Sequence, residues 1–365
     1  MDETDFPTRT HAQLSALQAE IPHAPIRTFD DPPAPDTSDW NGYIEPRRSQ
    51  DWLEVPWFFA ETYFYRRIVA ATGYFEAPSP ERDPFRRQKA EGLASSREAI
   101  AALSKRLVPA FDQDTPAVDP IVRAQTLSLW GNRADLSLWP AGSDADRTTA
   151  PADAHILADN RRAAAEWIVD HAPLGRIDVL LDNAGFELVS DLALIAVLLE
   201  TNAAASMHLH VKAHPTFVSD AVMMDVNETI RALAEADDSD TRTLGTRLRT
   251  HQADGRLTLT DPFFWTSPFP GWMMPDSLAR TLGASDLVIS KGDANYRRLL
   301  GDRHWPPTAP FARIVEYLPT RLLALRTLKS ELAAGIDAAT AEETASNDPD
   351  WLIDGEWGVI QFVGV

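Results

Sequence analysis

From about residue 155 onward, short apolar runs alternate with longer segments in which apolar residues recur every three or four positions. The short runs are typical of buried strands and the longer segments of helices. Strands that alternate with helices form a mainly parallel sheet with helices on both faces. We therefore expect an α/β protein with a three-layer α/β/α core, with strands at 177–181, 207–211, 256–261, 285–290, 311–318, 321–329 and 358–363.

The patterning before residue 115 is helical instead. Apolar and aromatic residues recur at helical spacing over residues 55–75, and a second helical segment covers residues 87–106. We therefore predict two parts, a mostly helical N-terminal subdomain over residues 1–115 and an α/β core over residues 116–365.

The charge and composition of the chain limit its partners. Its 54 acidic and 34 basic residues give a formal net charge of −20, which repels phosphate backbones and argues against nucleic-acid binding. Cysteine is absent, so any metal must be held by oxygen or nitrogen ligands. No run of 18 apolar residues is present, and the polar first residues do not resemble a signal peptide. We expect a cytoplasmic protein that acts on a small molecule and does not bind a membrane.

Polar residues that follow the predicted strands are candidates for a functional site, because ligands of open α/β sheets bind beyond the carboxyl ends of the strands. The strand at 177–181 runs directly into Asp182 and Asn183, whose side-chain oxygens could hold a hard cation. The same residues could instead form an Asx turn or cap the next helix.

The strand at 207–211 is followed by Lys212 and, after a short loop, by Asp220. Lys212 could meet a phosphate as a point charge, and Asp220 could be a metal ligand or a helix cap. Histidines also occur in this region, and each could bind a metal or be packed and hydrogen-bonded. We favour oxygen ligands over a metal site built from His208, His210 and His214.

Two further clusters supply positive charge and backbone amides. The strand at 285–290 leads into Lys291, Gly292 and Asp293, and the N–H groups of such a turn can bind an anion. The run at 321–329 ends in two cations that could close on a phosphate or lie at a solvated helix end, Arg326 and Lys329. Carboxylates, an amide and several cations at one sheet edge are what metal-assisted phosphoryl transfer requires.

The same four clusters carry a family resemblance. The segments LLDNAGFELVSDL, HVKAHPTFVSD, ISKGDANYRRLLGD and RTLK resemble the metal-dependent damage-control phosphatases, long labelled a domain of unknown function. RTLK is similar to the Arg-Thr-x-Lys signature of the sugar-phosphate branch, which includes proteins called acidic residue methyltransferase 1. Residues 55–75 and the segment LWGNRADLSLW at 129–139 are similar to the helical part of that branch.

The resemblance covers about residues 40–330 and implies specific roles for residues of this chain. It implies a divalent metal (manganese, cobalt or nickel, with magnesium as a further candidate) on an α/β/α core with a helical N-terminal subdomain. Metal ligands fall at Asp182, Asn183 and Asp220, and Glu187 belongs to the same motif. Phosphosugar contacts fall at Lys291, Gly292, Asp293, Ala294, Asn295 and Lys329, and we add Arg326 from its position beside Lys329.

The branch implies a phosphatase that acts on fructose 1-phosphate, fructose 6-phosphate and related sugar phosphates, in metabolite damage control. The nucleophile would be a metal-bound water or the carboxylate of Asp182. One alternative is an S-adenosylmethionine-dependent protein-glutamate carboxyl methyltransferase, although no glycine-rich loop follows a first strand. Another is a non-catalytic sugar-phosphate sensor, although a sensor has no need of two metal-ligating acids.

Overall fold

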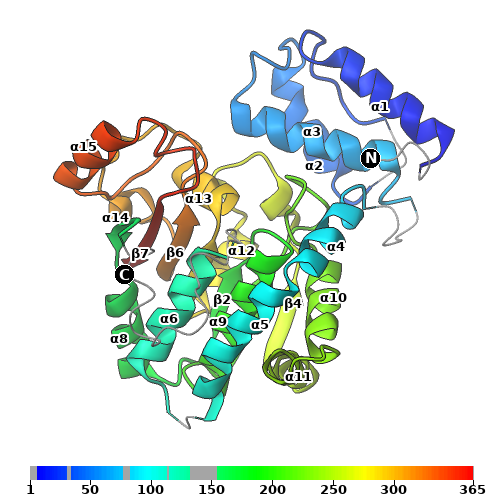
Figure 1. The fold of residues 1–365 in the computed structure, drawn as a ribbon. Coiled ribbons are helices and arrows are strands. Elements are labelled where there is room, and N and C mark those ends of the chain that lie inside the picture. The colour runs from blue at the N-terminus through cyan, green and yellow to red at the C-terminus, as the bar shows by residue number, and fades with distance from the viewer. Residues whose placement is uncertain (1–5, 31–33, 77–82, 113–114, 132–153, 365) are drawn as a thin grey trace.

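The computed structural model describes residues 6–30, 34–76, 83–112, 115–131 and 154–364. Its centre is a seven-stranded sheet with the strand order β1-β7-β6-β5-β2-β3-β4. Figure 1 labels β7, β6, β2 and β4 of this sheet. The strands are β1 (Ile156–Asp159), β2 (Ile177–Leu180), β3 (Met207–His210), β4 (Leu257–Thr260), β5 (Leu287–Lys291), β6 (Arg321–Thr327) and β7 (Gly358–Val363).

The sheet is mainly parallel, as predicted. Strands β2 to β6 all run in one direction, whereas β7 is antiparallel to β6 and β1 is parallel to β7. The chain passes from β2 through β3 to β4 at one edge and then returns to the other side of β2 to form β5 and β6. The strand order therefore reverses between β2 and β5, which is the kind of position where open α/β sheets bind ligands.

Helices cover both faces of the sheet, because successive residues of a strand point to opposite faces. One hydrophobic core joins Val179, Leu209 and Ile289 to the helices of the first face, and a second joins Leu180 and Val288 to those of the other. The first layer holds α5 (Arg97–Leu107), α6 (Val118–Leu129), α8 (Arg161–His171), α9 (Phe186–Glu200), α10 (Met223–Ala234) and α11 (Ser239–Ala253). The second holds η5 (Phe263–Thr266), α12 (Asp276–Gly283), α13 (Asp293–Leu300) and α14 (Phe311–Ile314), while η6 (Gly271–Met273) and α15 (Ala338–Asn347) complete this half of the chain.

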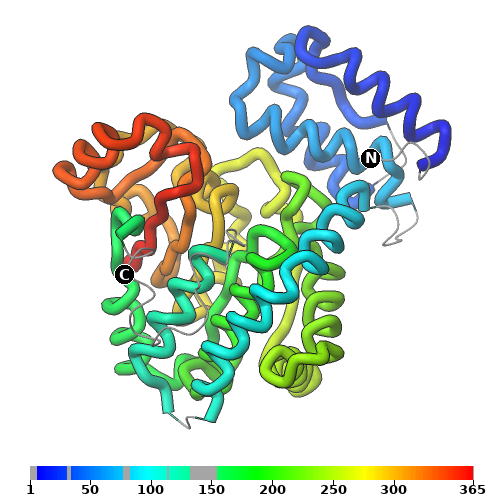
Figure 2. The backbone as a smooth tube through the Cα atoms, in the orientation of Figure 1, coloured from blue at the N-terminus to red at the C-terminus, as the bar shows by residue number. Residues whose placement is uncertain are grey.

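The first helices form a lobe of their own beside the sheet (Figures 1 and 2). It contains α1 (Thr8–Glu20), α2 (Thr37–Ile44), η1 (Glu45–Arg47) and α3 (Trp57–Thr72). Trp40, Phe59 and Tyr63 are buried in its separate core. From this lobe α4 (Arg86–Ser95) leads to α5, which packs on α9, and η3 (Val108–Asp112) follows. The division of the chain at residue 115 stays a prediction.

The predicted strand at 311–318 is wrong. The chain there forms the short helix α14, which begins after Pro310, because so short an apolar run does not distinguish a strand from a helix. Residues 132–139 of the LWGNRADLSLW segment lie outside the described residues. Within the parts of the chain that the structure describes, no helix is long and apolar enough to cross a membrane.

Candidate functional site

The two carboxylates predicted as metal ligands lie together beyond the end of β2. The residues after β2 pair with the segment that precedes α10, and Asn183 and Asp220 face each other in a short antiparallel bridge. The carbonyl of Asp182 accepts a hydrogen bond from the N–H of Ala221 at 2.7 Å. Both carboxyl groups are buried, with 3% exposure for Asp182 and 1% for Asp220. The pairing thus brings two sequence-distant carboxylates to the point where the strand order reverses.

Neither carboxylate caps a helix. Helix α9 begins after Gly185 and has no side-chain capping bond at its N-terminus. The N-terminus of α10 is capped by Asp225, whose carboxylate accepts a hydrogen bond from the N–H of Val222 at 2.9 Å. The capping alternative for Asp182 and Asp220 is therefore not realised in the structure.

The carboxylates of Asp182 and Asp220 are buried and repel each other, so a cation bound between them would stabilise their ionised forms. Burial, and after it the charge of Asp220, raises the pKa of Asp182 well above its usual value. Burial also raises the pKa of Asp220, and the charge of Lys212 opposes both shifts. A positive charge placed between two such groups stabilises their ionised forms.

Lys212 supplies one such charge. Its ammonium nitrogen lies 2.8 Å from Oδ2 of Asp220 and 3.8 Å from Oδ1 of Asp182, and its side chain is 2% exposed. The sequence suggested Lys212 as a phosphate contact only. Its contact with both carboxylates was not foreseen, because it depends on the bridge between the segments around positions 183 and 220.

Asn183 and Glu187 adjoin the pair. The amide nitrogen of Asn183 donates to Oε2 of Glu187 at 2.8 Å and to Oδ2 of Asp182 at 3.2 Å. Its amide oxygen accepts from the hydroxyl of Ser219 at 2.6 Å. Glu187 lies in the first turn of α9 and is buried, so it orients Asn183 from the helix side.

The donor set fits a hard divalent cation. Asp182 and Asp220 offer carboxylate oxygens, which such cations prefer, and the third oxygen of the predicted set is the amide oxygen of Asn183, which here accepts from Ser219. Oδ1 of Asp182 is buried without a hydrogen bond to any described residue, so this oxygen has free acceptor capacity. The described part of the chain contains no cluster of three or more His, Cys, Asp or Glu suited to a metal. A metal here would therefore rest on two carboxylates and one amide.

The turn after β5 passes directly beside the carboxylate pair. Gly292 has a φ of 78°, and a Cβ at this position would overlap the carboxyl group of Asp182. Asp293 and Ala294 follow as the first residues of α13. The first N–H groups of a helix have no acceptor within the helix, so they are available to an anion held beside Asp182.

Asn295, in the first turn of α13, contacts the ends of β2 and β5 and the side chain of Lys212. Its amide nitrogen donates to the carbonyl of Leu181 at 3.0 Å and to the carbonyl of Lys291 at 2.9 Å. Its amide oxygen accepts from the ammonium of Lys212 at 3.4 Å. Asn295 therefore fixes the ends of β2 and β5 relative to each other.

Two of the predicted phosphate-binding cations are engaged elsewhere, and the first is Lys291. Its ammonium donates to the carbonyl of Ser128 at 2.7 Å and lies 3.1 Å from Oδ1 of Asp191. All of these groups are buried among α6, α9 and β5, and burial raises the pKa of Asp191 to about 7. The ammonium of Lys291 is thus directed into the core.

Arg326 is the second. Its Nε donates to Oδ1 of Asp293 at 2.8 Å and its Nη1 to the carbonyl of Leu332 at 2.6 Å, while its guanidinium lies over the ring of Tyr296. The residue is 1% exposed and lies within β6, not at a helix end. Arg326 therefore holds the start of α13 against the loop after β6.

Lys329 is exposed and lines a large cavity. The cavity has a volume of about 1230 Å³ and lies between the helical lobe and the core, with Arg47, Trp57, Trp272 and Arg303 among its walls. The charge of Lys329 acts to lower the pKa of Asp182, against the dominant effect of burial. The positive charge of Lys329 therefore acts on Asp182, although no direct contact joins the two side chains among the described residues.

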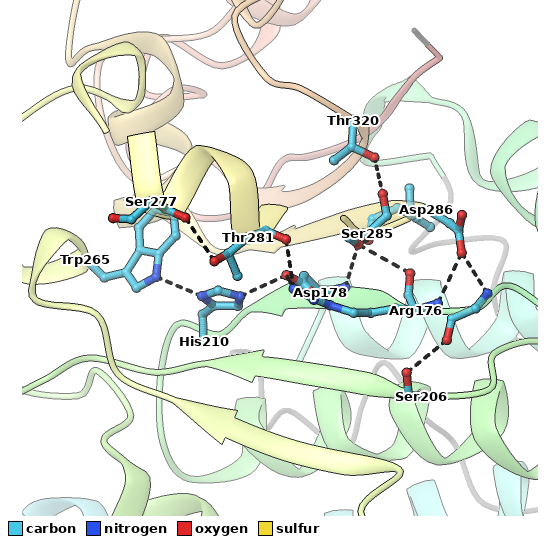
Figure 3. Close-up of polar contacts among 12 residues, drawn as sticks. Arg176, Asp178, Ser206, His210, Trp265, Ser277, Thr281, Ser285, Asp286 and Thr320 are labelled. Carbon is cyan, nitrogen blue, oxygen red and sulfur yellow. Dashed lines mark hydrogen bonds and ion pairs between the residues drawn. The ribbon is translucent and has the colours of Figure 1, made fainter. Parts of the chain in front are cut away.

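His210, the last residue of β3, is packed and hydrogen-bonded, as Figure 3 shows. Its Nδ1 accepts from the indole N–H of Trp265 at 3.2 Å, and its Nε2 lies 3.2 Å from Oδ2 of Asp178. Asp178 in turn pairs with Arg176 at 2.6 Å. His214 is fully buried, and burial lowers its pKa to about 4. The structure thus gives His210 and His214 roles in packing.

The helical lobe contacts the loop that carries Asp220. Phe217 and Val218 have positive φ angles of 47° and 66°, a conformation that is strained for residues with a side chain. Phe58 stacks on Phe217 with ring centroids 6.0 Å apart, and Tyr65 contacts the same ring at 5.4 Å. Helix α3 thereby holds the strained loop immediately before Asp220.

Comparison with known proteins adds an independent finding. The profile of the damage-control phosphatase ARMT1-like domain matches residues 3–344. The damage-control phosphatase ARMT1 of Danio rerio is 34% identical over 393 residues, covering 98% of this chain and 86% of that protein. The protein of the same name from Mus musculus is 33% identical over 355 residues, covering 90% and 81%. A solved DUF89 family protein from Pyrococcus horikoshii aligns with a TM-score of 0.45 and 15% identity, covering 83% and 81%.

Proposed function

The chain belongs to the damage-control phosphatase ARMT1-like family and is a phosphatase, and from that premise we propose that it hydrolyses small sugar phosphates in metabolite repair. Enzymes of this family generally depend on a divalent metal. We place that metal at Asp182, Asn183 and Asp220. The observation that carries the proposal is the buried carboxylate pair at the reversal of strand order, where Lys212 already neutralises part of the charge.

The phosphate group would be held next to this pair. When bound, a divalent cation withdraws negative charge from the phosphate and so favours attack at phosphorus. Lys329 and the first N–H groups of α13, at Asp293 and Ala294, would hold the other phosphate oxygens. Gly292 permits this approach because it leaves no side chain between the turn and Asp182.

The other residues of the predicted phosphosugar motif would act by positioning. Lys291 anchors the turn through Asp191, Asn295 joins the ends of β2 and β5, and Arg326 fixes Asp293. In this proposal the motif presents backbone amides, and most of its charged side chains keep those amides in place.

The cavity beside Lys329 would receive the sugar. Its volume of about 1230 Å³ exceeds what a hexose needs, and it combines aromatic walls such as Trp57 with polar and charged groups such as Glu61. Aromatic faces and hydrogen-bonding groups together suit the mixed surface of a sugar ring. Lys329 lines the cavity, so a phosphate held by Lys329 would place its sugar in the cavity.

The reaction breaks the bond between phosphorus and the sugar oxygen. Water supplies the oxygen that remains on phosphate, and a proton passes to the sugar oxygen. Asp182 either takes the phosphoryl group first or orients the attacking water. Hydride reduction of acid-quenched enzyme distinguishes these routes, because it converts a phosphorylated Asp182 into homoserine and leaves a free carboxylate unchanged.

A phosphate-release screen tests the proposal. Metal-stripped protein is supplied with manganese, cobalt, nickel or magnesium and with fructose 1-phosphate, fructose 6-phosphate or pentose phosphates. We expect release from at least one sugar phosphate with at least one metal. No release in any combination would contradict the sugar-phosphate proposal. Methyl transfer from S-adenosylmethionine to protein carboxylates would then be the next activity to test.

A further inference from the structure

Lys212 contacts both of the carboxylates that we propose as metal ligands. Its ammonium lies 2.8 Å from Asp220 and 3.8 Å from Asp182, and it donates to the amide oxygen of Asn295 at 3.4 Å. The side chain is 2% exposed, so water does not screen these contacts. Burying two carboxylates without a compensating cation is strongly unfavourable, and Lys212 supplies that compensation.

A divalent cation bound to these two carboxylates would lie close to the buried ammonium of Lys212, and the two positive charges would repel each other strongly. We propose that Lys212 is a resident counter-ion of this pair, which stabilises the metal-free enzyme and which leaves the carboxylates when a divalent metal binds. This inference rests on the proposed metal site. Neither the family comparison nor the sequence motif assigns this counter-ion role to Lys212.

The backbone of Lys212 is held in place, and a cavity lies beside the residue. Its backbone is fixed, because its N–H donates to the carbonyl of Ala221 at 2.9 Å and the residue forms a parallel bridge with Val222. Lys212 is also among the residues that line a second cavity, of about 750 Å³, together with Tyr74 and Phe75. A lysine side chain has a flexible four-carbon stem, so the ammonium can leave Asp220 while the backbone stays in place.

Lys212→Met tests the competition with metal. Methionine keeps the volume and the apolar stem but removes the charge. Calorimetric titration with manganese at pH 8 should show roughly ten- to a hundredfold tighter binding to the variant, because a charge-assisted contact no longer has to be broken. The metal-free variant should melt several degrees below wild type, and saturating manganese should raise its Tm by more than it raises that of wild type.

Lys89→Met is a matched control. Lys89 is also buried between two carboxylates, with its ammonium 3.1 Å from Asp83 and 2.8 Å from Asp225. Its loss should lower the Tm with and without metal by the same amount. Its manganese affinity should rise far less than that of Lys212→Met, because Lys89 pairs with carboxylates outside the proposed ligand set and acts on Asp220 without contacting it.

A measurement on the wild-type protein remains informative if Lys212→Met does not fold. Lysines are acetylated with limiting reagent in the metal-free and manganese-saturated states and quantified by mass spectrometry. We expect acetylation of Lys212 to rise severalfold with manganese, while Lys89 and Lys291 stay unchanged as buried controls. Equal labelling of Lys212 in both states would overturn the proposal.

The outcomes separate this proposal from the function that it rests on. Manganese binding by wild type with unchanged or weaker binding by Lys212→Met would overturn the counter-ion role and leave the proposed metal site intact. Absence of any binding of manganese, cobalt, nickel or magnesium by wild type would overturn the metal site, and the counter-ion role with it. Neither measurement contains a phosphorylated substrate, so neither depends on the identity of the sugar.

Discussion

Gly292 passes so close to Asp182 that a Cβ on Gly292 would overlap the carboxyl group of Asp182. The glycine also has a φ of 78°, which residues with a side chain rarely adopt. Two independent requirements thus exclude a side chain where the turn after β5 meets the end of β2. The relative position of these two strand ends decides whether phosphate-binding amides and carboxylates face the same point.

Gly292→Ala should therefore disable the site. We expect the free energy of unfolding to fall by about 1–3 kcal/mol from backbone strain, with a further loss from the overlap. Displacement of Asp182 should lower kcat/KM on the order of a hundredfold. Gly255→Ala is the control, because Gly255 has a φ of 73° but no atom within 4 Å of the added Cβ. The control should lose stability only, as measured by urea unfolding and phosphate release, and equal loss of activity in both variants would contradict the argument.

The sheet and the position of the candidate site at its edge could be predicted from the sequence because both depend on local patterns. Apolar runs such as that before Asp182 end abruptly in polar residues, and parallel strands bring their carboxyl ends to one edge. Asp182, Gly292 and Lys329 could be placed at that edge without coordinates.

The direction of individual cations could not be predicted, because it depends on distant partners. Lys291 points into the core because its ammonium contacts the carbonyl of Ser128 and the carboxylate of Asp191, which lie on two other helices. The guanidinium of Arg326 donates hydrogen bonds to Asp293 and to the carbonyl of Leu332 and is buried. Lys329, three residues later, is exposed. No spacing rule distinguishes a lysine that binds an anion from one that neutralises a buried carboxylate.

Removal of the divalent metal should abolish phosphate release. The reason is that the carboxylates of Asp182 and Asp220 would repel a phosphate without it. Dialysis against a chelator should give inactive protein, and manganese, cobalt or nickel should restore activity. At a metal concentration 100 times Kd, the free energy of unfolding should rise by about 2.7 kcal/mol, which thermal melting detects. Full activity of protein shown by elemental analysis to be metal-free would contradict this prediction.

Lys329→Met should weaken substrate binding and leave the fold intact, because Lys329 is exposed at the cavity. Loss of a charge-assisted phosphate contact worth about 1.5–3 kcal/mol should raise KM roughly ten- to a hundredfold. Metal affinity should change by less than about threefold, because Lys329 is exposed and solvent screens its charge from Asp182. Arg326→Met is the contrasting variant: it leaves Asp293 without its guanidinium partner, so it should lower the Tm markedly. A variant at 329 with unchanged KM for every active sugar phosphate would remove Lys329 from the phosphate site.

Acid should destabilise the protein partly through His214. Burial lowers the pKa of His214 to about 4, although nearby Asp36 acts in the opposite direction, whereas an exposed histidine titrates near 6.5. Between these values the unfolded chain binds a proton that the folded chain does not. The associated stability, on the order of 3 kcal/mol, is fully present above pH 6.5 and is lost as the pH falls to about 4. Urea unfolding from pH 7 to 4 should show this loss of unfolding free energy in wild type and a smaller loss in His214→Gln. If the unfolding free energies of the two proteins fall in parallel with pH, His214 does not cause the loss.

Asp220→Asn should remove metal binding while the fold persists. Asparagine keeps the volume of the side chain, and the ammonium of Lys212 retains Asp182 and the amide oxygen of Asn295 as neighbours, so no buried charge is left alone. With one carboxylate gone and Lys212 still present, the charge that attracts a divalent cation is largely cancelled.

Calorimetric titration of Asp220→Asn with manganese should therefore show no binding, and circular dichroism should match wild type. Asp225→Asn is the control, since Asp225 is also buried and pairs with a lysine, Lys89, but lies outside the proposed ligand set. That variant should lose about 1–3 kcal/mol of stability and still bind metal. If Asp220→Asn binds manganese with the affinity of wild type, Asp220 is not a ligand, and the metal, if one is used, is held without it.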